Sequence, residues 1–345
     1  MDKDKKVSLK DIANHLGVST ALVSYALNNK DKEARVGAEM AEKIRKAAIE
    51  LNYQPNIIAQ SLKRGTTNTI GLIVADISNP FFSSIARIIE DEARKYGYIV
   101  IFGSSDESEA QSKLLIDVLM SRRVDAFIIA PSEHTEKQIK GLLKRKVPVV
   151  LIDRYFPNIE TDFVQTNNFQ VAYEAVEHLI KNGRDRVGMM AYDTGLLHMQ
   201  DRINGYKEAL KDNGIKFKPS WLRKVSHPHL VRDVQSGIKS LVDPELKVNG
   251  FFFATNTLAV ESLKIINHSG IRVPDDLALI SFDESIAFDF FYSPLTYIRQ
   301  SIEELATEAV RLAIARIGDK EREPESVVVD AKLIVRSSSR GKGRK

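Results

Sequence analysis

The chain has 345 residues, 43% of them hydrophobic, with a formal net charge of +4 and no cysteine. This length predicts two or three domains, and the lack of cysteine excludes disulfides and thiolate metal sites. No run of about 18 apolar residues is present, which excludes a membrane-spanning helix. The N-terminal stretch MDKDKKVSLKD lacks the apolar core of a signal peptide, so we expect a cytoplasmic protein without membrane partners.

The positive charge is concentrated at the N-terminus. Residues 1–66 hold 12 Lys and Arg against 8 Asp and Glu, whereas the remaining 279 residues hold 38 of each sign. A small basic module is a candidate for nucleic-acid binding. A second basic cluster, RGKGRK, ends the chain, and we expect a disordered tail over residues 339–345.

Residues 8–52 predict a compact group of three short helices. The expected helices are Leu9–Leu16, Thr20–Asn28 and Ala38–Leu51. Ser8 and Ser19 are suitable N-caps, and Gly17 is suited to a left-handed helix end between the first two helices. Two helices joined by a tight glycine turn and braced by a third have the geometry of a DNA-binding helix-turn-helix. A generic three-helix bundle is the alternative.

From residue 69 onward, apolar runs alternate with helical stretches. The expected strands are TIGLIVA (69–75), YIVIFG (98–103), VDAFIIAP (124–131), VPVVLID (147–153), RVGMMAY (186–192), GFFFAT (250–255) and LALISF (277–282). Buried strands separated by helices predict parallel sheets covered on both faces. About 270 residues are too many for one ordinary sheet, so we expect two doubly wound lobes of roughly 130 residues each. Ligands of such folds bind at the carboxyl ends of the strands, here between the lobes.

Catalytic signatures are missing from this α/β region. It contains no G-x-S-x-G, H-E-x-x-H or P-loop motif, and we interpret His227-Pro228-His229 as an ordinary loop. Polar and aromatic residues instead follow several of the expected strands. This mixture suits a sugar, whose ring packs on aromatic faces while its hydroxyls bond charged groups. We therefore expect a binding protein without cofactor or metal, rather than an enzyme.

Five segments, which follow one another in the expected order along the chain, carry a resemblance that covers nearly the whole sequence. They are SLKDIANHLGVSTALVSYALNN, YQPNIIAQSLKRG, TIGLIVADISNPFF, VPDDLALISFDE and LIVRSS. Together they resemble the LacI/GalR family of bacterial transcription regulators. The resemblance implies a homodimer, a helix-turn-helix headpiece, a core like the type I periplasmic sugar-binding proteins, and an effector that alters affinity for a pseudo-palindromic DNA operator.

The resemblance places the second helix in the major groove. The DNA-contacting residues that it implies are Ser19, Thr20, Ala21, Ser24, Tyr25 and Asn28. Tyr25 stands where family members often have Arg, which reads guanine with two hydrogen bonds, so the operator half-site is expected to differ. A partly buried core aromatic is the alternative for Tyr25, and helix capping or solvation is the alternative for Ser19, Ser24 and Asn28.

The resemblance also implies the residues of the effector pocket, by similarity to pentose-binding relatives. They are Phe81, Phe82, Asp153, Arg154, Arg202, Asn256, Asp283 and Gln300. The two phenylalanines would cover the sugar ring and the others would bond its hydroxyls; helix caps or interlobe ion pairs are the alternative. The family often has Asn-Asp where this chain has Asn256-Thr257, which removes one carboxylate.

The segment PNIIAQSLKRG, which begins at residue 55, matches the hinge helix of the family. It is about two turns long, and a helix that short is marginal in water. The resemblance implies that two copies fold together in the minor groove, where a wedge between base steps offsets the cost of unstacking. The residues implied to contact DNA are Ile58, Ala59, Leu62 and Lys63. A flexible linker is the alternative.

The expected organisation is a headpiece over residues 1–54, a hinge over 55–66, a two-lobed core over 67–338 that binds the effector and dimerises, and the tail. The expected function is repression of carbohydrate-utilisation genes, relieved by a small sugar or sugar derivative. A corepressor-dependent regulator or an activator is one alternative. A sugar-binding protein without a DNA role is another, which the N-terminal module argues against.

Overall fold

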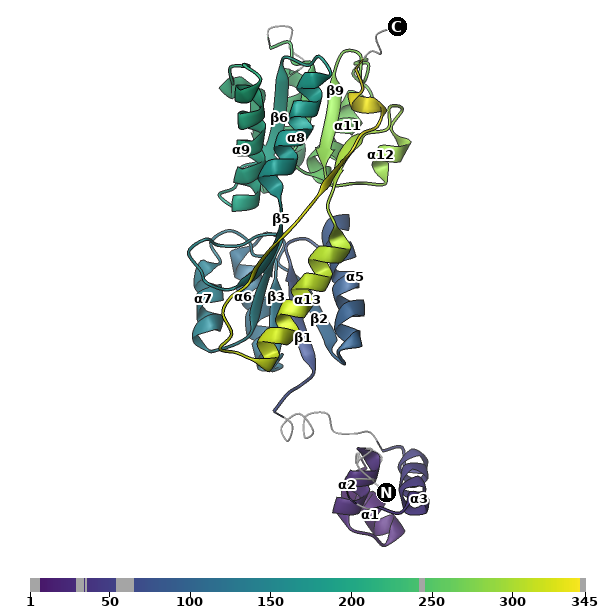
Figure 1. Ribbon diagram of the computed structural model, residues 1–345. Helices are drawn as coiled ribbons and strands as arrows, with labels where there is room; N and C mark the ends of the chain where they lie inside the picture. The colour runs from purple at the N-terminus through teal and green to yellow at the C-terminus, as the bar shows by residue number, and fades with distance from the viewer. Residues whose placement is uncertain (1–6, 29–33, 35, 54–64, 242–245, 342–345) are drawn as a thin grey trace. The chain divides into compact units, whose positions relative to one another are not determined.

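A computed structural model describes residues 7–28, 34, 36–53, 65–241 and 246–341 (Figure 1). The chain divides into two compact units, Met1–Thr67 and Asn68–Lys345, and each is considered by itself. Within the described ranges, no helix is both long and apolar enough to cross a membrane.

The first unit is the predicted three-helix module. Its helices are α1 (Leu9–Leu16), α2 (Thr20–Leu27) and α3 (Ala38–Glu50). Ser8 and Asp11 form a reciprocal capping box at the start of α1, and Gly17 ends α1 in the left-handed conformation with φ 65°. Ile12, Val23 and Ile44, one from each helix, are fully buried in a common core. Helical spacing of apolar residues therefore predicted this module to within one residue at each helix end.

The first lobe of the second unit is a six-stranded sheet with strand order β11-β5-β4-β3-β1-β2. Its strands are β1 (Thr69–Val74), β2 (Ile99–Ser104), β3 (Ala126–Ile129), β4 (Val149–Ile152), β5 (Asp162–Thr166) and β11 (Ser326–Val329). The paired strands are parallel throughout, with Ile70 in register with Val100 and Ala126. Helices α5 (Pro80–Lys95) and α13 (Ile302–Gly318) cover one face, and α6 (Glu109–Ser121) and α7 (Glu136–Lys144) cover the other.

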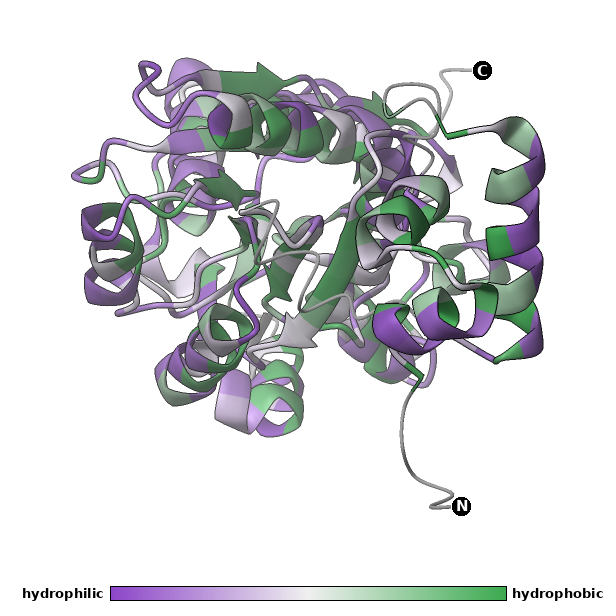
Figure 2. Ribbon diagram, turned by 90° about the horizontal axis from the view of Figure 1, so that it is seen from below, coloured by the Kyte–Doolittle hydropathy of each residue, from purple (hydrophilic) through white to green (hydrophobic). Residues whose placement is uncertain are grey.

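The second lobe repeats this plan with strand order β12-β10-β9-β8-β6-β7. Its strands are β6 (Val187–Tyr192), β7 (Leu222–Val225), β8 (Gly250–Phe253), β9 (Ala278–Phe282), β10 (Thr296–Arg299) and β12 (Lys332–Ile334). Its helices are α8 (Asn168–Lys181), α9 (Leu197–Asp212), α10 (Leu230–Leu241), α11 (Asn256–Ile266) and α12 (Ala287–Phe290), with short 3-10 turns at Pro219–Trp221, His227–His229 and Ser337–Ser339. In both lobes the strands are mostly hydrophobic and the helices are amphipathic (Figure 2), as predicted for sheets covered on both faces.

Two features of the sheets differ from the sequence-based prediction. β12 runs antiparallel to β10, so the second sheet is mixed. Five strands, β5, β7, β10, β11 and β12, were not among those expected. All five carry exposed or partly exposed positions, although three of the four residues of β10 are buried. They lack the continuous apolar runs that identify central parallel strands.

The two lobes are interleaved along the sequence rather than consecutive. The chain passes from lobe to lobe after β5, after β10 and after β11 (Figure 1). Hydrogen bonds join these crossovers to one another: Thr166 Oγ1 donates to Gln300 Oε1, and Asn167 Nδ2 donates to Asp330 Oδ1 at 2.9 Å. Ser301 Oγ also donates to the Asp330 carbonyl at 2.8 Å. The three crossovers are therefore linked to one another and form a single interlobe hinge, which is distinct from the hinge helix expected over residues 55–66.

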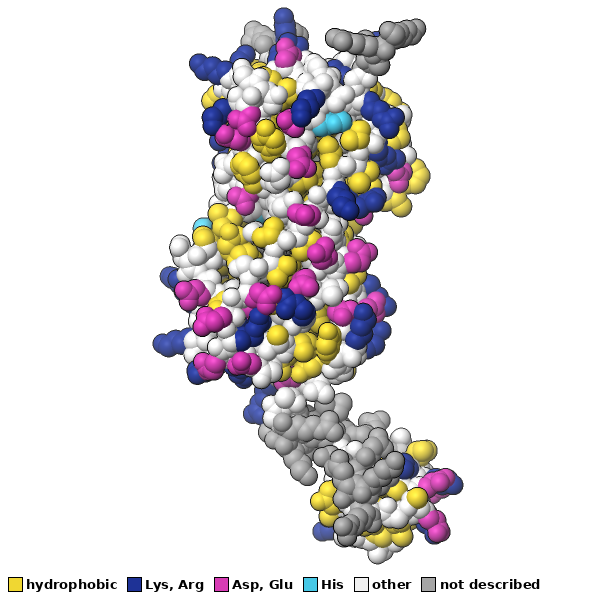
Figure 3. All heavy atoms as spheres, in the orientation of Figure 1, with side chains coloured by type: hydrophobic (Ala, Val, Ile, Leu, Met, Phe, Trp, Pro, Cys, Tyr) yellow, Lys and Arg dark blue, Asp and Glu magenta, His cyan; other side chains and the backbone are white. Residues whose placement is uncertain are grey.

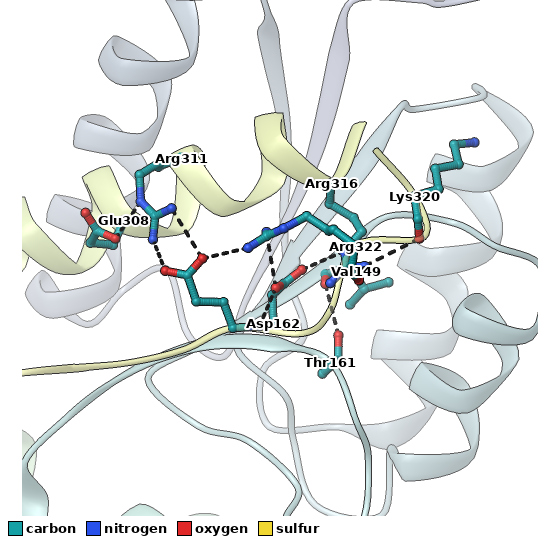
Figure 4. A network of polar contacts seen from close by, with 9 residues as sticks. Val149, Thr161, Asp162, Glu308, Arg311, Arg316, Lys320 and Arg322 are labelled. Carbon is teal, nitrogen blue, oxygen red and sulfur yellow. Dashed lines mark hydrogen bonds and ion pairs between the residues drawn. The ribbon is translucent and has the colours of Figure 1, made fainter. Parts of the chain in front are cut away.

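Charged side chains of both signs are interspersed over the face of the second unit shown in Figure 3, as its zero net charge requires. Among the described residues, the charged side chain with no exposed surface is that of Asp162, at the start of β5 (Figure 4). It accepts hydrogen bonds from Arg316 Nε at 2.8 Å, Arg322 Nη1 at 3.3 Å and the Glu325 backbone N–H at 2.9 Å. This network fastens α13 and β11 to the edge of the first sheet.

The C-terminal segment is ordered further than predicted. Ser339 is fully buried, and its Oγ lies 2.6 Å from Thr296 Oγ1 and 2.9 Å from His178 Nε2. The Gly341 backbone N–H donates to Asn182 Oδ1 at 3.1 Å. The expected boundary between core and tail at residue 338 is therefore too early, because these residues find hydrogen-bond partners in the second lobe. Residues 342–345 lie outside the described ranges.

Candidate functional site

The first lobe contributes a buried ion-pair cluster at the carboxyl ends of β2 and β4. Asp153 follows β4 with φ 66°, a left-handed conformation that is uncommon outside glycine. The next residue, Arg154, makes a two-pronged ion pair with Glu107, with Nη1–Oε2 and Nη2–Oε1 distances of 2.8 and 2.7 Å. Arg154 Nε lies 3.3 Å from Asp153 Oδ2, and its guanidinium lies 5.7 Å from the centre of the Phe82 ring. The guanidinium is thus held by two carboxylates.

This pairing governs the ionisation of the first-lobe cluster. Burial raises the pKa of Asp153, although the charge of Arg154 opposes that effect. Burial also acts to raise the pKa of Glu107, but the charge and hydrogen bonds of Arg154 outweigh it and lower that pKa. Burial lowers the pKa of Arg154, yet Glu107 and Asp153 more than compensate, so that pKa is raised. Arg154 and Glu107 are therefore both charged at neutral pH.

The second lobe places Arg202 of α9 at the opposite side of the site. Arg202 Nε donates to Asn168 Oδ1 and Nη1 donates to the Ala254 carbonyl, both at 2.8 Å, and its guanidinium stacks 3.4 Å from the centre of the Phe282 ring. Gly205, one turn further along α9, permits this arrangement, since a Cβ there would lie 2.3 Å from the Phe169 carbonyl oxygen of α8. Burial lowers the pKa of Arg202; its hydrogen-bond partners are neutral, and the charges of Asp283 and Asp153 oppose the effect only in part.

Asp283 is the second-lobe counterpart of Asp153. It follows β9 with φ 64°, and its Oδ1 accepts a hydrogen bond from Gln300 Nε2 at 2.5 Å. Burial raises its pKa to about 6, against the opposing effects of Arg202 and Gln300. Because Gln300 also accepts the hydrogen bond from Thr166, Asp283 is connected through Gln300 to the interlobe hinge.

Asn256, the first residue of α11, connects the lobes. Its Nδ2 donates to Asn79 Oδ1 in the first lobe and to the Glu284 carbonyl in the second, both at 3.3 Å. Thr257, which stands where a carboxylate is frequent in the family, donates to Asn256 Oδ1 at 3.3 Å. A second polar contact between the lobes joins the Gly195 backbone N–H to Glu133 Oε1 at 2.5 Å.

The eight predicted effector residues are all buried, with at most 8% of each exposed. A cavity of about 310 Å³ opens beside them. Three of the eight, Phe81, Asp283 and Gln300, line this cavity together with Tyr297, Glu284 and residues of both lobes. The other five do not line it. The predicted residues thus come from both lobes, and their contact with a ligand stays a prediction.

Several residues of this cluster were missed from the sequence. Glu107 follows β2 and could have been found from its place at a strand end. His198 lies within α9; it is buried, and its Nδ1 has no hydrogen-bond partner among the residues that the structure describes. His227 forms a 3-10 turn after β7 instead of the expected plain loop, and its ring stacks on Tyr192 with centres 3.8 Å apart. It was missed because β7 was missed. Over the same described ranges, no cluster of His, Asp and Glu is arranged to hold a metal ion.

The predicted DNA-contacting residues lie on and around α2. Thr20 and Ala21 are exposed, and Tyr25 is 45% exposed. Capping is observed for Ser19, whose Oγ accepts from the Leu22 backbone N–H at 3.2 Å, and for Asn28, whose Nδ2 donates to the Ser24 carbonyl at 2.7 Å. The other predicted contacts, Ile58, Ala59, Leu62 and Lys63, lie outside the described residues.

Two family models match the chain. Residues 8–56 match "Bacterial regulatory proteins, lacI family", and residues 176–339 match a "Periplasmic binding protein-like domain". The "Ribose operon repressor" of Halalkalibacterium halodurans is 31% identical over 334 residues, covering 97% of each chain. The "HTH-type transcriptional repressor PurR" of Mannheimia succiniciproducens is 30% identical over 333 residues, covering 96% of this chain and 98% of the relative.

Solved structures share the fold. A LacI family transcriptional regulator from Enterococcus faecium with bound ribose aligns with a TM-score of 0.70 and 28% identity, covering 79% of this chain and 99% of that one. The lac repressor dimer bound to operator and the anti-inducer ONPF aligns with a TM-score of 0.85 and 22% identity, covering 98% of this chain and 100% of that one.

Proposed function

The chain belongs to the LacI family of bacterial regulatory proteins and is a DNA-binding transcriptional regulator; on that premise we propose that it represses carbohydrate-utilisation genes and is released from its operator by a small sugar. The sugar binds between the two lobes of the core. The protein acts as a homodimer in the cytoplasm, where a bacterial operator lies, and it has no catalytic role. Two headpieces of a dimer match the two half-sites of a pseudo-palindromic operator.

The convergence of strand-end polar groups from both lobes carries this proposal. Asp153 and Arg154 come from the first lobe, and Arg202 and Asp283 come from the second. All four are buried, and charges in one lobe affect pKa values in the other: Arg202 acts to lower the pKa of Asp153, and Asp153 acts to raise the pKa of Asp283. Charged groups that donate and accept hydrogen bonds suit vicinal hydroxyls, and Phe81 and Phe82 offer apolar faces to a ring.

The same arrangement suggests how the sugar controls DNA binding. A ligand changes the balance of two conformations only by its difference in affinity for them. A sugar that bonds Asp283 competes with Gln300, which is tied through Thr166 to the crossovers. Sugar binding then alters the angle between the lobes, and with it the spacing of two headpieces in a dimer.

On the DNA side, we propose that Thr20, Ala21 and Tyr25 face the bases of the major groove and that residues 55–66 form the hinge helix. The exposure of these three side chains supports the first part. Tyr25 lacks the bidentate donors with which Arg reads guanine, so a half-site different from the usual family sequence follows. Leu62→Ala is expected to weaken operator binding while leaving sugar affinity unchanged.

The effector is tested by measuring the melting temperature of the full chain with a panel of pentoses and hexoses. A ligand that binds only the folded state raises its stability, and we expect one class of sugar to do so. Asp283→Ala should abolish that shift but keep operator affinity, whereas the matched control Asp185→Ala, an exposed carboxylate on the second lobe, should keep both. A normal sugar response in Asp283→Ala would contradict the site.

Operator binding is tested by gel shift on the DNA upstream of the gene over a salt series. Phosphate contacts predict a steep loss of affinity with rising salt. Failure to bind any palindromic upstream sequence, with or without sugar, would contradict repression of adjacent genes. Tighter binding in the presence of the sugar would instead identify a corepressor.

A further inference from the structure

The guanidinium of Arg154 is the most completely neutralised cation of the interlobe cluster. Its two terminal nitrogens are both paired with Glu107, at 2.7 and 2.8 Å, and its Nε faces Asp153 at 3.3 Å. Side-chain exposure is only 9% for Arg154 and 18% for Glu107. Arginine binds phosphate through the same pair of parallel N–H donors that Glu107 occupies here. A phosphate can therefore reach this fork only by displacing a carboxylate.

The charges around the fork do not favour an anion either. Arg154 and Arg202 face three carboxylates of the cluster, Glu107, Asp153 and Asp283, and the partly buried Asp76 lies at the end of β1 nearby. Glu133 adds a further negative charge near His227. The cluster thus holds more carboxylates than cations among its described residues.

The two histidines of the cluster do not supply the missing positive charge. Burial lowers the pKa of His198 well below its usual range, and the neighbouring Arg154 and Arg202 lower it further. Burial also lowers the pKa of His227, although Glu107 opposes this. Both imidazoles are therefore predominantly neutral at pH 7.

From these contacts we propose that Glu107 makes the effector site selective for a free, unphosphorylated sugar over its phosphate ester. The inference rests on the proposed function, in which a sugar binds between the lobes. A hydroxyl can donate to a carboxylate and accept from a guanidinium at the same time, so it suits a paired Arg–Glu–Asp cluster. A phosphate only accepts at neutral pH, and beside Glu107 and Asp153 it meets like charges in a buried environment.

This selectivity assigns the effector a place in a reaction sequence. Phosphoryl transfer from a nucleotide to a sugar hydroxyl consumes the free sugar and yields the ester. A regulator that accepts the sugar and rejects the ester responds to sugar that has not yet been phosphorylated. Its signal therefore falls as a sugar kinase acts.

The test measures binding of free pentoses and hexoses and of their phosphate esters to the full chain by titration calorimetry. For the wild type we expect a free sugar to bind at least about 100-fold more tightly than its ester, the ratio that a buried unpaired charge imposes. Equal affinity for both, or a preference for the ester, would overturn the selectivity while leaving a sugar effector in place. Binding of neither class would overturn the sugar effector itself, and the selectivity with it.

Variants assign the selectivity to Glu107. Glu107→Gln should tighten ester binding by about tenfold or more, because it frees Arg154 and removes a like charge. Glu107→Asp keeps the charge and should keep the wild-type preference, and Glu321→Gln, an exposed carboxylate paired with Lys146 away from the cavity, is the matched control. Unchanged ester affinity in a Glu107→Gln protein that melts cooperatively would remove Glu107 from this role. If that variant does not fold, a loss of preference in Glu107→Asp would do so.

Discussion

Each lobe contributes one buried aspartate and one buried arginine to the site, but the two arginines are bound by different kinds of partner. Each lobe ends a buried strand with an aspartate in the left-handed conformation, Asp153 in the first and Asp283 in the second. Each also supplies a buried arginine. Arg154 is bound by carboxylates, whereas Arg202 is bound by a side-chain amide oxygen, a backbone carbonyl and an aromatic face.

The difference shows that residue identity does not determine the electrostatics of a buried group. The pKa of Arg154 is raised by Glu107 and Asp153, and the pKa of Arg202 is lowered by burial among neutral partners. Asp283, whose hydrogen-bond partner is the neutral Gln300, has its pKa raised to about 6. The first lobe thus presents a fixed ion pair, and the second presents groups whose charge is weakly compensated.

The largest expected difference between the two lobes is in the stability lost when each arginine is replaced in turn. Arg154→Met leaves two buried carboxylates without their cation, and we expect it to lower the free energy of unfolding by about 3 kcal/mol or more. Arg202→Met leaves uncharged acceptors without a donor, and Asp283, which loses the opposing charge of Arg202, can take up a proton because its pKa is already raised; we expect a cost of about 1–3 kcal/mol. Urea denaturation at pH 7.5 measures both. A larger loss for Arg202→Met would contradict the comparison.

The second largest expected effect is the pH dependence of stability that is caused by the raised pKa of Asp283. Below about pH 4 this carboxyl is protonated in both the folded and the unfolded protein. Between about pH 4 and pH 6 only the folded state keeps the proton, so stability falls as pH rises through that window. Asp283→Asn stays neutral and retains an oxygen for Gln300, so its advantage over the wild type should grow to about 3 kcal/mol by pH 7.

Urea denaturation at several pH values checks this expectation. The matched control is Asp289→Asn, a carboxylate that is 60% exposed and ion-paired with Arg336 on the surface of the same lobe. Its stability should run parallel to that of the wild type between pH 4 and pH 7. A parallel profile for Asp283→Asn would mean that Asp283 is ionised in the folded protein throughout.

The smallest expected effect concerns the interlobe hinge formed by the three crossovers. Thr166→Val removes the hydroxyl that donates to Gln300, and it should change the ratio of operator affinities without and with sugar by about threefold, the worth of one neutral hydrogen bond. Thr161→Val is the matched control, since Thr161 Oγ1 donates to the Val149 carbonyl at 3.0 Å, away from the crossovers. An equal change of the ratio in both variants would exclude a specific role for the hinge.

The sequence predicted the parts of the molecule that follow from local patterns. Periodic apolar residues and caps located the headpiece helices, and long apolar runs located the central strands. The rule that ligands bind at the carboxyl ends of parallel strands drew attention to Asp153 and Asp283 among several strand-end residues, and the resemblance to the family implied their role. Resemblance to the family added Arg202 and Gln300, which lie in segments without such a signal.

The remaining features depend on contacts between distant segments. β11 was not expected because it is a short edge strand in which only Val329 is buried, and its place beside β5 is secured by the network around Asp162. The pairing of Glu107 with Arg154 joins residues 47 positions apart. Neither residue carries a local pattern that reveals its partner, so the pairing of the Arg154 guanidinium with Glu107 could be found only from the three-dimensional structure.

The interleaving of the lobes also dictates the order in which the molecule can be completed during synthesis. The ribosome delivers β1 to β5 first, but α13, which buries Leu305 and Val310 against that sheet, emerges only after β6 to β10 of the other lobe. The outer strand β11 follows later still. One apolar face of the N-terminal lobe is therefore covered only in part, by α5, until nearly the whole chain has been made, and a chain that stops at residue 300 ends with neither lobe complete.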